Sequence, residues 1–134
     1  MANLRKVKWS RLEIEDAVIF YRPLVRGYLK EQARLDAELR ASKGLGEKDP
    51  IDALDTIETQ CEALIGAGVI GGWSGWEDDG KPIPDHVAGV PFDEAATVVA
   101  RLLLGNDDIY VALMKASSQA ASAYWKDEET AAKN

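Results

Sequence analysis

The sequence predicts a mainly α-helical protein of about four helices in one small domain, with a short N-terminal β-hairpin as one of two interpretations of that region. Apolar residues recur at three- and four-residue steps in four segments, the period of an amphipathic helix. Glycine, proline, aspartate and asparagine separate the segments, as they do at helix ends. A chain of 134 residues fits one domain with a real core. We expect residues 1–125 to be globular and residues 126–134 to be a flexible polar tail.

The region before Pro23 is open to two interpretations. Apolar and polar residues alternate at period two around Trp9, and a β-branched and aromatic run follows at 17–21. This pattern favours a β-hairpin. An amphipathic helix over residues 10–20 is the alternative. Pro23 ends either element and suits the first turn of a new helix.

The next two segments have clear helical patterns. Residues 24–42 carry apolar side chains near one face and charged side chains on the others, and the glycines at 44 and 46 end the helix. Asp49-Pro50 predicts a second helix start, because aspartate can cap and proline suits the first helical position. The acidic face of this second helix, residues 51–65, is either a solvated face or a docking surface for a basic partner helix.

The last two helices begin at acidic caps. Asp93 can cap the third helix, which is apolar on most sides and is therefore expected to lie centrally. Gly105 closes it. Asn106, Asp107 and Asp108 are expected to cap the last helix, where the two acids favour the positive end of its dipole. The apolar stripe of that helix includes Tyr110 and Tyr124.

The stretch GGWSGWEDDGKPIP at 71–84 is the most distinctive part of the chain. Glycine costs about 1 kcal/mol and proline about 3 kcal/mol per position in a helix, so we expect an irregular connector over about 71–91. Trp73 and Trp76 then either pack over the helix ends or form an aromatic anchor for a partner. Packing is favoured, with Trp76 the more outward of the two.

Composition and motifs do not indicate an enzyme. His86 is the only histidine, and a loop position is a simpler interpretation than a general base or metal ligand. Cys61, the only cysteine, excludes an intrachain disulfide, favours a reducing compartment and is interpreted as apolar filler rather than a nucleophile. Phosphate-loop and nucleophile-elbow motifs are missing. We therefore expect no enzyme activity and no cofactor.

Charge narrows the class of partner. A net charge of −7 argues against a general affinity for nucleic acid or an anionic membrane. Acids at 77–79 lack the spacing of a calcium loop and are better interpreted as a turn, so no metal is expected. Partner contacts are instead expected at six residues: Trp73, Trp76, Asp78, Asp79, Tyr110 and Tyr124.

Several motifs together resemble a known family. They are GWSGWEDDGKPIP at 72–84, PFD at 91–93, DIYxALxxA at 108–116 and AKN at 132–134, with a looser match in FYRPLVRGYL at 20–29. This order resembles that of the tail assembly chaperones of long-tailed bacteriophages. The resemblance covers the C-terminal half well and carries no catalytic signature.

The resemblance implies a specific role. Such chaperones are small, acidic and largely helical, and they hold the long, aggregation-prone tape measure protein while tail tube subunits polymerise around it. The implied partners are the tape measure protein and the tail tube protein, in the host cytoplasm and outside the mature virion; self-association stays open. The alternative is a virion structural component, such as a head–tail connector or a tail-tube-associated protein.

The resemblance also implies a longer form made by programmed ribosomal frameshifting near the end of the short form. Lys133-Asn134 can be encoded AAA AAC, and an Ala132 codon ending in A would complete a slippery heptamer. The hypothesis is that the gene reads A AAA AAC at this point. Sequencing the gene checks it, and a non-slippery codon choice or the lack of an overlapping −1 frame would contradict it.

Overall fold

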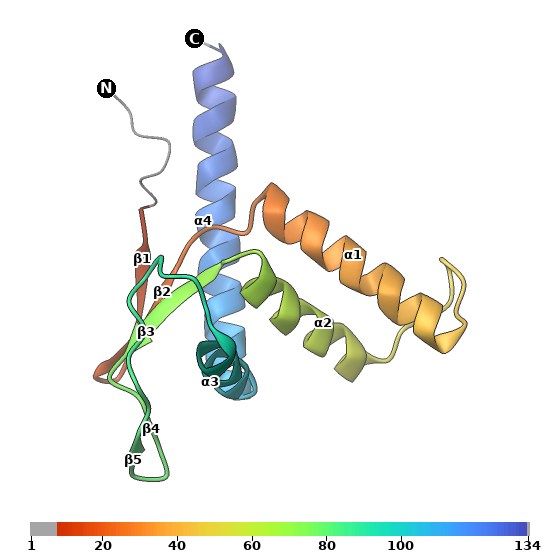
Figure 1. Ribbon diagram of the computed structural model, residues 1–134. Helices are drawn as coiled ribbons and strands as arrows, with labels where there is room; N and C mark the ends of the chain where they lie inside the picture. The colour runs from red at the N-terminus through yellow and green to blue at the C-terminus, as the bar shows by residue number, and fades with distance from the viewer. Residues whose placement is uncertain (1–7, 134) are drawn as a thin grey trace.

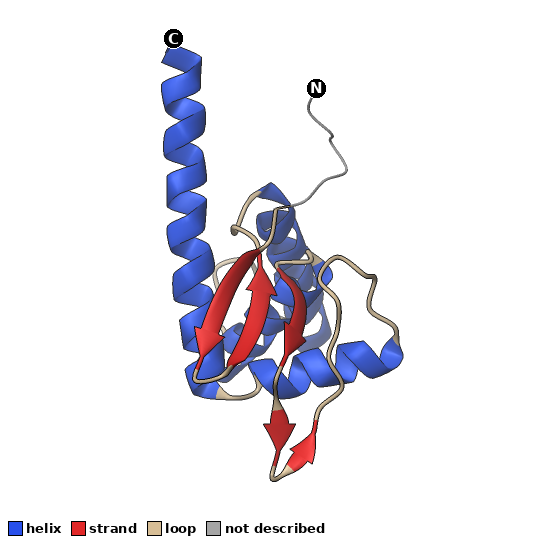
Figure 2. Cartoon of the chain, turned by 90° about the vertical axis from the view of Figure 1, so that its left-hand side faces the viewer, coloured by secondary structure: helices blue, strands red, loops and turns tan. Residues whose placement is uncertain are grey.

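The computed structural model describes residues 8–133, with side chains described through Lys126. Figure 1 shows a small sheet, two helices beside it and a pair of helices that projects to one side; Figure 2 shows the sheet as a layer in front of the helices. Within residues 8–133 the elements are β1 (Ser10–Ile14), β2 (Ala17–Tyr21), α1 (Arg26–Lys43), α2 (Ala53–Gly66), β3 (Ile70–Ser74), β4 (Glu77–Asp78), β5 (Lys81–Pro82), α3 (Glu94–Leu104) and α4 (Asp107–Lys133).

The predicted N-terminal hairpin is confirmed, and the alternative helix does not form. β1 and β2 pair antiparallel, from Ser10 opposite Tyr21 to Ile14 opposite Ala17. The two strands are joined by Glu15 and Asp16, and Glu15 has the left-handed φ of 55° that tight hairpin turns require. Period-two alternation was therefore the correct signal for this region.

The predicted irregular connector over about 71–91 is wrong in its first half, because residues 70–74 form a third strand and β4 and β5 pair antiparallel as a short hairpin. β3 pairs antiparallel with β2, so the sheet order in the described chain is β1-β2-β3, and β2 is central. The fold is therefore mixed α/β with four helices, rather than purely helical apart from a hairpin. Glycine is depleted in strands, which is why the sequence concealed this element.

Close backbone approach explains the two glycines in β3. The pairing register shifts between Phe20 and Tyr21, so that Gly71 is the extra residue of a bulge. A Cβ at Gly71 would stand 2.2 Å from the Trp9 ring, and one at Gly72 would stand 2.4 Å from the carbonyl oxygen of His86. Any side chain here would displace an aromatic ring or the neighbouring backbone.

The predicted helices form, with corrected boundaries and caps. Asp52, not Asp49, caps α2: its Oδ1 accepts a hydrogen bond from the Leu54 amide at 2.8 Å. Asp49 instead closes the loop before α2, where its Oδ2 accepts from the Gly46 amide at 2.7 Å. Asp93 caps α3 as expected, accepting from the Ala96 amide at 2.8 Å.

The last helix is longer than the sequence indicated. α4 begins at Asp107 and continues through Lys133, so residues 126–133, expected to be a polar tail, are helical. Residues 1–7 and Asn134 lie outside the described part of the chain. They include the start of the expected N-terminal alternation and the last residue of the expected tail. Within residues 8–133, no helix combines the length and apolar character needed to cross a membrane.

One hydrophobic core lies between the sheet and the helices. The largest of its fully buried side chains come from β2, α2, β3, α4 and the turn after α2: Trp73, Ile19, Leu64, Ile70, Leu113 and Val69. α3 adds Ala100, Leu103 and Leu104. The α1–α2 pair extends away from this core and is closed at its far end by an ion pair between Lys43 and Asp55. The core therefore depends on contributions from all parts of the chain.

Gly72→Ala is expected to lower the free energy of unfolding by about 1–3 kcal/mol, because the new methyl group meets backbone atoms that cannot rotate away. Urea denaturation followed by circular dichroism measures the change. Gly27→Ala is the control: a Cβ there meets nothing within 4 Å, and alanine favours the helix by up to about 1 kcal/mol. Equal stability of the Gly72→Ala variant and the wild type would contradict the close approach.

Candidate functional site

Trp73 is a structural side chain. Only 1% of its surface is exposed, and its Nε1 donates a hydrogen bond to the carbonyl of Pro84 at 3.0 Å. The indole stacks on His86 with ring centroids 5.1 Å apart and meets the edge of Phe92 at 5.2 Å. Trp73 therefore fixes the segment before α3 against β3. Because it is buried, Trp73 is not accessible to a partner, and packing is the correct one of the two predicted alternatives for this residue.

Trp76 is a partly exposed side chain whose inner side packs against the core. The side chain is half-buried against the core, and its Nε1 donates to the carbonyl of Val18 in β2 at 2.9 Å. It is the more exposed of the two tryptophans in the 71–84 stretch, as predicted. The hydrogen bond fixes the orientation of the indole, so that the remaining ring surface is presented in a defined direction.

Two hollows flank Trp76. One, of about 620 Å³, lies between the β1–β2 turn and the first turns of α4, and the other, of about 360 Å³, lies between the β4–β5 hairpin and the junction of α3 with α4. Figures 1 and 2 both show these turns and the start of α4 at the same end of the molecule. The apolar residues that line them are Ile14, Ala17, Trp76, Pro82, Ile83, Leu102, Leu103, Ile109 and Ala112.

The walls of these hollows are acidic. Five carboxylates line them, and no lysine, arginine or histidine does: Glu15, Asp16, Glu77, Asp78 and Asp108. The acids come from the β1–β2 turn, β4 and the first turn of α4, so the fold gathers charges that are up to 93 positions apart in sequence. We call Trp76, the two hollows and these five acids the Trp76 surface.

Of the six predicted contact residues, only Trp76 and Asp78 belong to the Trp76 surface. Asp79 lies at the tip of the β4–β5 hairpin, where its φ of 50° serves the turn. The Tyr110 hydroxyl and the Gln60 Oε1 form a hydrogen bond that joins α4 to α2. Both Asp79 and Tyr110 thus have a local structural role.

Tyr124 is a separate surface feature. It is 44% exposed on α4, next to Trp125, which is 47% exposed, and the two rings meet edge to face with centroids 5.5 Å apart. Ile109 of the Trp76 surface lies fifteen positions earlier on α4, a separation of roughly 22 Å along the helix axis. The C-terminal part of α4 projects past the sheet in Figure 2, so this aromatic pair is accessible but distant.

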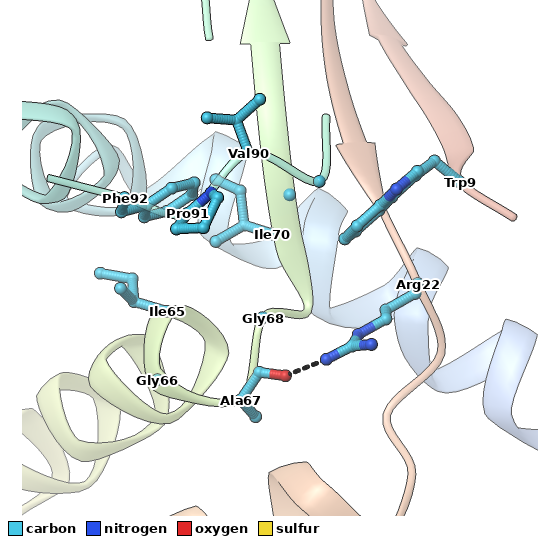
Figure 3. A pocket seen from close by; sticks show the side chains of 12 residues that line it. Trp9, Arg22, Ile65, Gly66, Ala67, Gly68, Ile70, Val90, Pro91 and Phe92 are labelled. Atoms are coloured by element: carbon cyan, nitrogen blue, oxygen red, sulfur yellow. Dashed lines mark hydrogen bonds between the residues drawn. The ribbon is translucent and has the colours of Figure 1, made fainter. Parts of the chain in front are cut away.

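A further cavity, of about 390 Å³, lies between the end of α2, β3 and the segment before α3. Figure 3 shows the Arg22 guanidinium at one side of it, donating to the carbonyl of Ala67 at 2.5 Å, with the Trp9 ring nearby. The guanidinium carbon lies 5.8 Å from the centre of that ring. The opposite wall is apolar, formed by Ile65, Ile70, Val90, Pro91 and Phe92.

The reactive side chains have structural surroundings. Burial, followed by the charges of Glu62 and Glu58, raises the pKa of the Cys61 thiol to about 11, so the thiol stays protonated at neutral pH. His86 Nε2 lies 2.7 Å from the carbonyl oxygen of Val90, within a loop. Across the residues with described side chains, histidine, cysteine and acids form no group of three that could hold a metal ion.

The sequence missed several residues that line these surfaces. Glu15 and Asp16 were not identified as candidate contact residues, Trp9 entered only through the period-two alternation, and Arg22 only through the looser match at 20–29. Their positions follow from the β2–β3 pairing, which places Val18 opposite Ser74 and so sets the β1–β2 turn beside Trp76. A strand pairing between segments more than fifty positions apart leaves no local sequence signal.

Comparison with models of known protein families, with curated proteins and with solved structures finds no match for this chain.

The raised pKa predicts slow alkylation of Cys61. A thiol with a pKa of about 11 rather than 9.0 has roughly a hundredfold less thiolate at pH 8, so iodoacetamide should modify the folded protein far more slowly than the urea-unfolded protein. Mass spectrometry over time measures both rates. Since folding favours the protonated thiol, the free energy of unfolding should also fall as the pH rises from 9 towards 11. Equal alkylation rates for the folded and unfolded protein would contradict the assignment.

Proposed function

We propose that this protein is a tail assembly chaperone of a long-tailed bacteriophage, which binds the tape measure protein and tail tube subunits during tail assembly. The proposal is carried by one observation: the two most extended family-like motifs meet in a single surface. The 72–84 motif supplies Trp76, Glu77, Asp78, Pro82 and Ile83 to the Trp76 surface, and the 108–116 motif supplies Asp108, Ile109 and Ala112.

Exposed apolar side chains on the helices also support the proposal. Val98 and Leu102 lie one turn apart on α3 and are 58% and 48% exposed, and Val111 on α4 is 59% exposed. Val98 and Val111, with Tyr124 and Trp125, give the molecule several apolar contact points besides the Trp76 surface, whose smaller hollow Leu102 lines. Accessible apolar surface of this kind is what a protein needs to cover the apolar face of a helical client.

The proposed mechanism is non-covalent binding, in which no covalent bond is made or broken. A chaperone of this kind stabilises its client by covering apolar surface, which lowers the concentration of free, aggregation-prone chain. Its affinity has to be modest enough for the tail tube subunits to displace it during polymerisation. Several separate apolar contacts, each releasable, suit this requirement better than one deep pocket.

Co-expression with the product of the long open reading frame that we expect beside this gene, the proposed tape measure protein, should keep that product soluble and yield a complex on affinity purification. The measurement is the soluble fraction of the tape measure protein with and without this chain. An unrelated acidic helical protein of similar size is the control.

Two outcomes would contradict the proposal. A tape measure protein that neither co-purifies with this chain nor gains solubility would remove the chaperone role. Detection of the chain at stoichiometric levels in purified virions would favour a structural component of the tail or connector instead.

A further inference from the structure

We propose that the Trp76 surface docks a basic segment of the partner protein, in which one apolar side chain packs beside Trp76 and flanking lysines or arginines face the acidic walls. The inference rests on the proposed chaperone function and names the chemistry of the segment that is held. It commits to a lysine- or arginine-bearing stretch around an aliphatic or aromatic residue.

The shape of the surface supports an apolar anchor. The two hollows lie on either side of one fixed indole, and Glu77 lines both, so they form one continuous surface. Ile109 also lines both hollows and contributes an apolar floor beside Trp76. Because Trp76 is already held by its hydrogen bond to Val18, little side-chain freedom would be lost on binding.

The charges support basic flanks. Among the described residues, none of the five acids of the Trp76 surface forms an ion pair, whereas Asp36, Asp55 and Glu62 elsewhere each do. Lys81 stands opposite Asp78 in the β4–β5 ladder but forms no ion pair with it in the described part of the chain. Unpaired like charges around an apolar floor repel one another, and a basic segment would relieve that repulsion while speeding the encounter.

The same charges disfavour other occupants. A nucleic acid or an acidic peptide would be repelled by the five carboxylates. A second copy of this chain carries the same net charge of −7, so long-range repulsion opposes its approach. A partner that is basic at the contact is therefore the occupant that fits both the floor and the walls.

A random display library of short peptides, selected on the immobilised wild-type protein, tests the inference without assuming any partner. The test variant is Asp16→Lys/Glu77→Lys, which reverses two walls of the surface. The control is Glu38→Lys/Glu47→Lys, which makes the same charge change at exposed sites on and after α1, away from the acidic face of α2. Peptides enriched on the wild type should carry lysine or arginine around an apolar residue. Their dissociation constants should rise about tenfold in the test variant and much less in the control.

Salt dependence and oligomeric state complete this measurement. Binding should weaken as ionic strength rises, because exposed charges are screened within about 10 Å at 0.1 M salt. Selected peptides that are neutral or acidic, or that lose equal affinity in both variants, would overturn the inference. Burial of the Trp76 surface in a dimer of this chain, seen as a concentration-dependent mass that the test variant abolishes, would also overturn it.

Co-purification with the tape measure protein separates the inference from the proposed function. If the wild type and the control variant retain the tape measure protein and the test variant does not, both stand. If all three retain it equally, the function stands and the docking surface is elsewhere. If none retains it while the library still selects basic peptides, the docking chemistry stands and the chaperone role fails.

Discussion

The pairing of β3 with β2 is the constraint on which the rest of this structure depends. Gly71 and Gly72 allow β3 to lie against the Trp9 ring on one side and against the backbone at His86 on the other, at distances that leave no room for a Cβ. This approach buries Trp73 almost completely and lets its indole hold the segment leading to α3. Without that pairing, β1 and β2 would be an isolated hairpin, which is only marginally stable in water.

The same pairing assembles the candidate site. By placing Val18 opposite Ser74, it brings the acidic β1–β2 turn next to Trp76 and gives the Trp76 Nε1 its acceptor. The first turns of α4 then line the remaining side of the surface. Asn106 fixes the start of this helix, because its Oδ1 accepts a hydrogen bond from the Ile109 amide at 3.2 Å. Trp76, expected to lie in an irregular connector, is thus a fixed part of a surface lined by residues of β1, β2, β4, β5, α3 and α4.

The fold therefore uses the two tryptophans differently. Trp73 gives its whole surface to the core, so its contribution is the burial of a large apolar side chain. Trp76 donates a hydrogen bond from its Nε1 to the carbonyl of Val18, and part of its ring remains exposed. The five carboxylates around it form no ion pair among the described residues, so their like charges repel one another.

The sequence by itself determined the local elements: the helical period and the Asp93 cap located four helices, and period-two alternation located the hairpin. It also contains one cysteine and one histidine, which limits the candidate nucleophiles and metal ligands among those residue types. Only the tertiary structure decided that 70–74 is a strand, that Trp73 is core and Trp76 is surface, and that five distant acids share one site. The reason is physical. Helix caps and periodicity are set by neighbours within a few residues, whereas β3 forms by pairing with the distant β2. Its glycines make that pairing possible because they leave room for the Trp9 ring and for the backbone at His86.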